Sequence, residues 1–146
     1  MGTFYAGCVV VNLTERNQMA EVPKLLVDTG SECTWINKDV LIRIGVTAEK
    51  KGMQFLMANG KTLTRNVGFA VLRVGDRFTV DEVVFALEGD LQLLGARTLE
   101  GLNLTVDPAR KRLIGAGPLP AAAADGLIHS VHNATVVDNS YGVACG

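Results

Sequence analysis

The sequence of 146 residues is poor in cysteine, histidine and aromatic side chains. Its three cysteines, Cys8, Cys33 and Cys145, are odd in number and irregular in spacing. Because this arrangement is not a disulfide framework, it favours a reducing compartment, and we expect a cytoplasmic protein. The formal net charge is −1 and no basic stripe is present, so we expect no nucleic-acid partner. No apolar run approaches the length of a membrane span, so we expect no membrane partner either.

The scarcity of histidine limits the chemistry that the chain can perform. His129 and His132 are its two histidines, and they form with Cys145 only a weak metal-binding pattern, because a second pair of ligands is missing. We therefore expect neither a metal nor any other cofactor. A catalytic cysteine needs a positioned base. Since no histidine precedes His129, Cys33 is predicted to be a small core residue rather than a nucleophile.

The sequence is rich in glycine, valine and leucine, and its short apolar runs predict a mostly β fold. A single domain of this length can bury a core without metals or disulfides. Asn37 can cap a short helix that ends before Gly45, and a helical turn is expected at 96–100. Strands are predicted at 8–11, 22–27, 34–36, 53–57, 61–64, 69–74, 78–87, 91–94, 104–106 and 112–114.

Two stretches of the chain carry further expectations. The apolar end of the run 22–27 predicts a strand buried on both faces. The composition changes after residue 115 to glycine, proline and alanine, followed by a polar stretch without period. This change predicts one domain over residues 1–116, and a linker and tail of unknown role over 117–146.

The residues best suited to chemistry are Asp28-Thr29-Gly30, directly after the apolar run Leu25–Val27. A carboxylate at the end of a buried strand can be held rigidly at the floor of a cleft. Peptide hydrolysis by carboxylates needs two such groups, one ionised to take a proton from water and one protonated to polarise the carbonyl. The chain contains one Asp-Thr/Ser-Gly sequence only, so a complete site requires a two-fold dimer. The alternative is an ordinary turn with Asp28 as an exposed cap.

Two other motifs follow in order. Met57-Ala58-Asn59-Gly60 lies between strand-like segments, and Asn-Gly is a strong hairpin signal because both residues tolerate positive φ. Leu93-Leu94-Gly95-Ala96 comes after a second hairpin. With the Asp28 turn, this ordered series resembles the retropepsin-like aspartic proteases, a family of single-domain peptidases that includes retroviral and bacterial members. The chain is similar to the bacterial type over residues 1–116.

The resemblance implies a retropepsin-like β-barrel of one lobe, with one or two short helices, that is active as a two-fold dimer. Asp28 would be the catalytic residue, as general base on one subunit and general acid on the other. The Thr29 hydroxyl would lock the two catalytic loops together across the dimer axis. Gly30 would bring its N–H close to the carboxylate, and Ser31 can offer a further hydroxyl donor near Asp28.

The resemblance also assigns roles to the two later motifs. Leu94 and Gly95 would belong to a strand that lies beside the catalytic loop, where glycine permits close backbone contact. The hairpin tip 57–60 would be a flap that closes over the substrate, although a plain surface hairpin is the alternative. Trp35 is predicted to be a core residue beside the catalytic loop.

Together these expectations predict a homodimeric aspartic endopeptidase that acts on polypeptides bound in an extended form. The apolar residues Leu56, Met57 and Leu93-Leu94 suggest a preference for apolar side chains beside the cut. One alternative is a catalytically silent dimerisation or peptide-binding module that keeps the fold. A third interpretation is a monomeric β-domain whose function lies in its tail.

Overall fold

The computed structural model describes residues 2–121. Its helices and strands lie within a compact unit, Met1–Ala116, which is described here by itself. A second unit, Gly117–Gly146, adds only residues 117–121 to the described part, without helix or strand. The predicted tail beyond residue 121, with His129, His132 and Cys145, lies outside the described residues.

The fold is mostly β with two short helices, as predicted. In chain order the elements are β1 (Tyr5–Asn12), β2 (Met19–Asp28), β3 (Thr34–Asn37), α1 (Lys38–Arg43), β4 (Lys50–Leu56), β5 (Thr62–Val74), β6 (Arg77–Ala86), β7 (Leu93–Gly95), α2 (Ala96–Gly101), β8 (Leu104–Asp107) and β9 (Arg112–Gly115). The strands β8 and β9 form a separate antiparallel pair around the Asp107-Pro108 turn, where the sequence predicted one.

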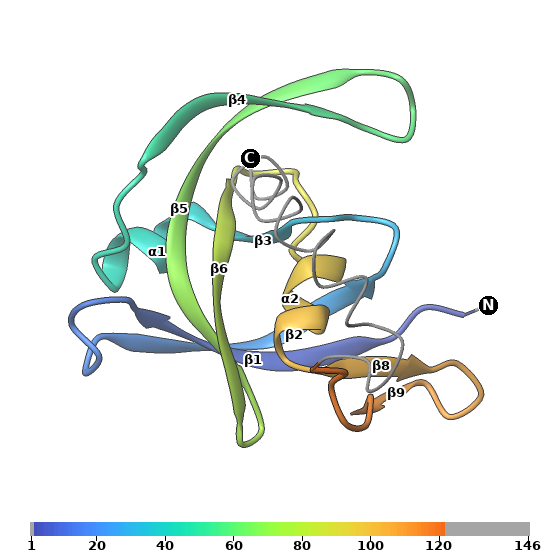
Figure 1. Cartoon of the computed structure of the whole chain (residues 1–146). Coiled ribbons are helices and arrows are strands. Elements are labelled where there is room, and N and C mark those ends of the chain that lie inside the picture. Colours follow the sequence, from blue (N-terminus) through green and yellow to red (C-terminus); the bar gives the residue numbers. More distant parts are fainter. Residues whose placement is uncertain (1, 122–146) are drawn as a thin grey trace, which may run out of the picture. The chain divides into compact units, whose positions relative to one another are not determined.

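Six strands close into a barrel in the order β1-β2-β7-β3-β6-β5, and pairing of β5 with β1 completes the ring. The pairs β2–β7 and β3–β6 are parallel, and the other pairs of the ring are antiparallel. Strand β4 stands outside the ring and pairs with the first part of β5. Figure 1 shows this β4–β5 hairpin reaching away from the barrel. Closure of the ring leaves no exposed barrel edge for another chain to pair with.

Alternating side chains of the strands divide the apolar residues between two clusters. On β6, Val83 and Phe85 join the main core, whereas Val84 and Ala86 join a smaller cluster around Trp35. This division follows from the period of two, since successive side chains leave opposite faces of a strand. The main core also contains Val10, Leu25, Ile36, Leu41, Leu72 and Leu94.

The predicted helix start at Asn37 is confirmed. The Asn37 side chain accepts a hydrogen bond of 2.7 Å from the backbone N–H of Asp39, which satisfies one of the free donors of the first turn of α1. The cap also fixes the direction in which the chain leaves β3.

Two strand predictions differ from the structure in their extent, and a third differs in the burial of the strand. Segments 61–64 and 69–74 are one continuous strand, β5, because its first part pairs with β4 and its later part with β6 and β1. The polar residues between the segments therefore do not end the strand. On β2, Leu25 is fully buried but Leu26 and Val27 are only half-buried, so this strand is not buried on both faces. Leu91 precedes β7 and is exposed.

Candidate active site

Asp28 is the last residue of β2 and begins a tight turn. The N–H of Gly30 donates to the Asp28 carboxylate oxygen Oδ1 at 2.9 Å, and the N–H of Ser31 donates to the Asp28 carbonyl at 3.2 Å. A Cβ atom at Gly30 would lie 3.2 Å from the same carboxylate oxygen, so a larger residue would crowd this contact. The turn fixes the direction of the half-buried carboxylate and leaves Thr29 exposed beside it.

The Ser31 side chain does not reach the carboxylate. Its hydroxyl donates to the carbonyl of Cys33 at 3.1 Å, whereas the sequence suggested a bond near Asp28. The Ser31 carbonyl in turn accepts from the N–H of Ala96 at 2.7 Å. Ser31 therefore connects the Asp28 turn to the start of α2, and its hydroxyl is not available to the Asp28 carboxylate.

Strand β7 lies directly beside the end of β2. The two strands are parallel, with Val27 opposite Leu94 and Asp28 opposite Gly95. A Cβ atom at Gly95 would collide with the carbonyl group of Cys33, so only glycine fits at this crossing of chains. The structure thus brings together Asp28, Leu94 and Gly95, which are far apart in the sequence. Leu94 is buried and cannot contact a substrate, which corrects the suggestion that Leu93-Leu94 lines the cleft.

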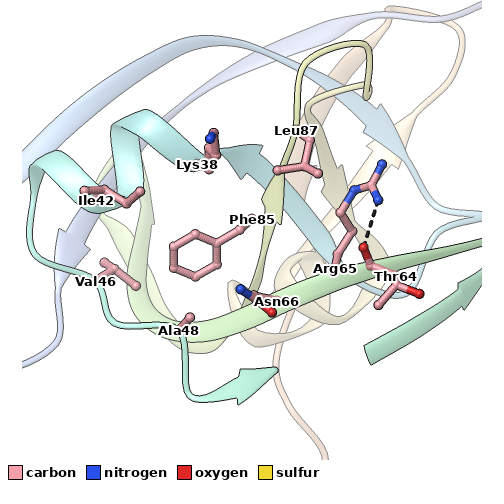
Figure 2. Close-up of a pocket in the computed structure, with 9 residues that line it drawn as sticks. All are labelled: Lys38, Ile42, Val46, Ala48, Thr64, Arg65, Asn66, Phe85 and Leu87. Carbon is pink, nitrogen blue, oxygen red and sulfur yellow. Dashed lines mark hydrogen bonds between the residues drawn. The ribbon is translucent and has the colours of Figure 1, made fainter. Parts of the chain in front are cut away.

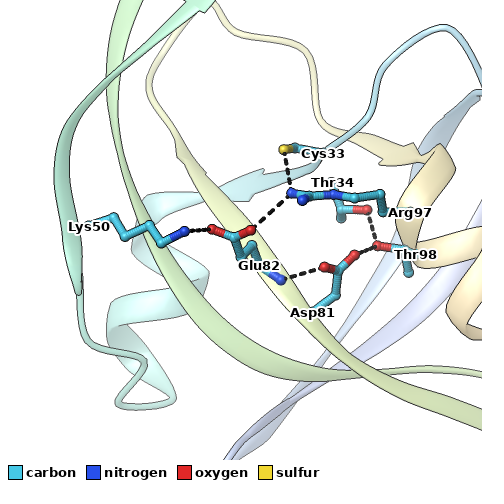
Figure 3. A network of polar contacts seen from close by, with 7 residues as sticks. All are labelled: Cys33, Thr34, Lys50, Asp81, Glu82, Arg97 and Thr98. Atoms are coloured by element: carbon cyan, nitrogen blue, oxygen red, sulfur yellow. Dashed lines mark hydrogen bonds and ion pairs between the residues drawn. The ribbon is translucent and has the colours of Figure 1, made fainter. Parts of the chain in front are cut away.

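A chain of hydrogen bonds runs from Gly95 to a carboxylate, and Figure 3 shows its part from Thr34 to Asp81. The N–H of Gly95 donates to the Thr34 hydroxyl at 3.0 Å, and the hydroxyls of Thr34 and Thr98 are 2.6 Å apart. Thr98 donates to Asp81 at 2.8 Å, so the proton between the two threonines must come from Thr34. Both threonines are buried. Because every hydroxyl has a donor and an acceptor partner, the chain holds β3, β7 and α2 in one arrangement.

The same network in Figure 3 extends through Glu82 to Cys33 and Lys50. The N–H of Glu82 donates to the Asp81 carboxylate at 2.7 Å. Arg97 lies 3.1 Å from both the Cys33 sulfur and Glu82, and Glu82 pairs with Lys50 at 2.6 Å. Burial opposes ionisation of Glu82, but the hydrogen bond from Lys50 and the charges of Lys50 and Arg97 outweigh it and lower the pKa of Glu82. The sequence did not predict this network, since each member resembles an ordinary surface charge.

Neither thiol in the described part has the environment of a nucleophile. Burial raises the pKa of Cys33 despite the Arg97 guanidinium beside it, and it raises the pKa of Cys8 to about 11. A raised pKa disfavours the reactive thiolate at neutral pH. Both thiols are free, and Cys33 packs against the Trp35 cluster.

The hairpin tip is the three-residue loop 58–60 that the strands predicted at 53–57 and 61–64 leave between them. The N–H of Gly60 donates to the Met57 carbonyl at 2.9 Å, and the N–H of Met57 donates to the Lys61 carbonyl at 2.8 Å. Gly60 has a φ of +85°, whereas Asn59 is not in the left-handed region. The loop therefore has three residues, with Ala58 and Asn59 at the centre of the turn and Gly60 after them. The Asn59 side chain also accepts a hydrogen bond from the Lys61 N–H at 2.9 Å.

The hairpin is connected to the active-site strands through the Trp35 cluster. Trp35 is buried, as predicted, and contacts the Phe55 ring edge-on, with 5.1 Å between the ring centres. Met57 and Leu63 of the hairpin pack against the same cluster, as does Leu26 of β2. The residues Ala58, Asn59 and Gly60 of the tip are exposed.

Asp28 and Thr29 also border a surface pocket of about 240 Å³. Its other walls are residues 2–4, the end of β2, Val106 and Pro108.

Within residues 2–121, no three His, Cys, Asp or Glu side chains lie together in a way that could hold a metal ion. Neither of the two described helices is long and apolar enough to cross a membrane.

Comparison with known proteins agrees with the arrangement of these residues. Residues 14–96 match the aspartyl protease family, a range that contains the Asp28 turn, the β4–β5 hairpin and the Leu94-Gly95 strand. No curated protein matches the chain. The family match covers more than half of the 146 residues, and with the closed barrel and the Asp28–Gly95 pairing it shows that the chain belongs to the retropepsin-like aspartyl protease family.

Proposed function

We propose that residues 1–116 form an aspartic endopeptidase that is active as a homodimer. The observation that carries the proposal is the Asp28 turn, in which the Gly30 N–H binds the carboxylate at the end of β2, directly beside Gly95. The Gly30 N–H fixes the direction of the carboxylate, and the Ser31 N–H closes the turn on the Asp28 carbonyl. One chain supplies one such carboxylate.

In the proposed dimer, Asp28 of each chain faces the two-fold axis. Two carboxyl groups about 3 Å apart share one proton, because both cannot be ionised at that distance. The ionised group takes a proton from a water molecule, whose oxygen attacks the carbonyl carbon of the peptide bond. The protonated group gives its proton to the carbonyl oxygen. The carboxyl group that took the water proton then gives it to the leaving nitrogen, and a hydroxyl of the tetrahedral intermediate returns its proton to the other carboxylate as the C–N bond breaks. The pair again holds one shared proton.

The residues around Asp28 have supporting roles in this proposal. Thr29 is exposed next to the carboxylate, where its hydroxyl can reach the partner chain. The hairpin tip 57–60 covers an extended polypeptide and excludes water from it. The exposed Leu56 and half-buried Met57 would contact apolar side chains of that peptide. Two free thiols in the described part fit a reducing compartment, and we propose the cytoplasm.

The test is the substitution Asp28→Asn, measured by cleavage of an unbiased peptide mixture. The amide has the shape of the carboxylate but cannot act as a base, so cleavage should fall by about a thousandfold or more, while the size and circular dichroism of the protein stay unchanged. Cleavage at the wild-type rate would refute the assignment of Asp28. A wild-type protein that dimerises and binds peptides but cleaves none would instead be a silent binding module.

A further inference from the structure

Both strands of the β4–β5 hairpin separate from the barrel at the same height, near Lys50 on β4 and Val67 on β5. Strand β5 pairs with β6 from Val67 onward, whereas residues 62–65 pair with β4 alone. Val67 pairs with both strands. On the opposite strand the register shifts between Lys50 and Met53. Bulges of this kind bend a strand and re-aim the residues beyond it. This level is therefore the place where the hairpin can change its angle to the barrel.

Arg65 lies at this level and forms the most shielded ion pair among the described residues. Its guanidinium donates to both carboxylate oxygens of Asp90, at 2.7 Å and 2.8 Å, and the two side chains are only 13% and 9% exposed. Such two-point pairing is stronger and more directional than a single contact. It also orders two side chains that are far apart along the chain.

Asp90 belongs to the segment that leads into β7. Its carboxylate accepts from the N–H of Leu87 at 2.8 Å, which closes the turn after β6. Two residues later, the Gln92 carbonyl accepts from the N–H of Leu26 at 3.1 Å, and its side chain accepts from the N–H of Asn37 at 2.9 Å. The segment is thus fixed to β2 and β3, and the Arg65 ion pair fixes the hairpin to this segment.

A pocket separates part of the hairpin base from α1. Figure 2 shows this pocket, with Thr64, Arg65 and Asn66 on one wall and Ile42 on another. Its volume is about 270 Å³. The first strand of the hairpin has its own tie, Lys50 to Glu82, but Lys50 is more exposed than Arg65.

We propose that Arg65 and Asp90 form a latch that sets the position of the β4–β5 hairpin over the catalytic turn. The two are positioning residues, which act on the substrate through the hairpin tip 57–60. With the pair formed, the hairpin stays close to the segment that continues into β7 beside Asp28. Without it, the hairpin opens more often at the bulge. The role in catalysis rests on the proposed protease function, whereas the effect on hairpin motion does not.

Amide hydrogen exchange of the full-length protein without substrate tests the latch. In Asp90→Asn and in Arg65→Gln, amides of residues 53–64 should exchange about tenfold faster, because each variant removes charge-assisted hydrogen bonds. Amides of the barrel, such as Val71 and Val83, should keep their wild-type rates. Arg65→Gln leaves the Asp90 bond to Leu87 in place, so it separates loss of the latch from damage to the turn. Arg110→Gln, at an exposed ion pair with Asp107, is the matched control and should change neither region.

Peptide cleavage gives a second measurement with a different meaning. Both latch variants should raise KM several-fold with a smaller change in kcat, and Arg65→Lys should recover part of the loss through a one-point contact. Unchanged exchange in the hairpin of both variants, or equal acceleration in hairpin and barrel, would overturn the latch. If the wild-type protein cleaves no peptide, the protease proposal fails, while hydrogen exchange still decides for or against the latch.

Discussion

The catalytic turn and the β4–β5 hairpin are attached to the same barrel by different kinds of contact. The turn is held by strand pairing with β7 and by the buried hydroxyls of Thr34 and Thr98. The hairpin side chains are mostly exposed, and it is held by its ion pairs and by the packing of a few apolar side chains on Trp35. Stability is therefore concentrated under Asp28 and is low in the hairpin.

This difference matches what the proposed peptidase activity would require of each region. A carboxylate that takes a proton has to stay close to its working position, and the buried hydrogen bond between Thr34 and Thr98 holds the strand beside Asp28. A cover over a polypeptide has to open for the substrate to enter, and weak attachments at a bulge allow this. The comparison teaches that rigidity and mobility come from the type of contact, since both regions consist of the same kind of strand.

The largest effect should come from truncating one leucine in each region. Leu94→Ala removes a fully buried side chain next to the catalytic strand, and the free energy of unfolding should fall by about 2–5 kcal/mol. Leu56→Ala in the hairpin, where the side chain is 77% exposed, should change it by less than about 0.5 kcal/mol. Urea unfolding at one protein concentration measures both. Equal losses would contradict the contrast between the two regions.

A smaller effect is expected from deleting one hydroxyl. Thr98→Val keeps the shape but leaves Thr34 and Asp81 without their partner, which should cost about 1–3 kcal/mol of stability. The same substitution at the exposed Thr62 of the hairpin is the control and should be nearly neutral. If Thr98→Val were as neutral as Thr62→Val, the hydrogen-bond chain from Gly95 would not hold the catalytic strand in place.

A local pattern was sufficient to predict the strand that ends at Asp28, since an apolar run precedes this residue. The close approach of Gly95 to the Asp28 turn was implied by the resemblance to the retropepsin-like proteases, and the structure pairs Gly95 with Asp28. The Asn37 cap and the Asp107-Pro108 turn were predictable from local patterns, since the residues that form each of them are close in sequence.

The contacts that hold these parts together could not be predicted from the sequence. Arg65 and Asp90, or Thr34 and Thr98, are distant along the chain and look like ordinary polar residues, because burial and pairing appear only once the barrel closes. The hairpin tip was predicted in part. The strands predicted at 53–57 and 61–64 leave the three-residue loop that the bond between Met57 and Lys61 closes. A positive φ, which both Asn59 and Gly60 tolerate, occurs only at Gly60.

The latch should depend on pH in a defined direction. The hydrogen bond from Arg65 lowers the pKa of Asp90. A lowered folded-state pKa means that the stabilisation is complete above the unfolded value, about 3.9, and is lost as the pH falls through the lower folded value. Between pH 7 and pH 5, the free energy of unfolding of the wild type should exceed that of Asp90→Asn by about 1 kcal/mol. This difference should shrink below about pH 4. Urea unfolding across this range measures it, and a difference that persists undiminished to pH 2 would contradict an ionic latch.

The smallest expected effect tests whether the active site is formed by two chains, each of which supplies one Asp28 carboxylate. Wild-type and Asp28→Asn chains are mixed in equal amounts and allowed to exchange subunits. With random pairing, about a quarter of the dimers carry two Asp28 carboxylates, whereas the same wild-type chains alone would form twice as many active dimers. The activity should therefore be half that of a simply diluted wild type. Arg110→Gln chains are the control and should cause no loss, since their carboxylates are intact. When one kind of chain is labelled with ¹⁵N, mixed dimers can be counted by mass. A mixture that exchanges fully but loses no activity would then mean that one chain holds a complete site. Asp28 would then need a second carboxylate from its own chain, and the dimeric mechanism would be wrong.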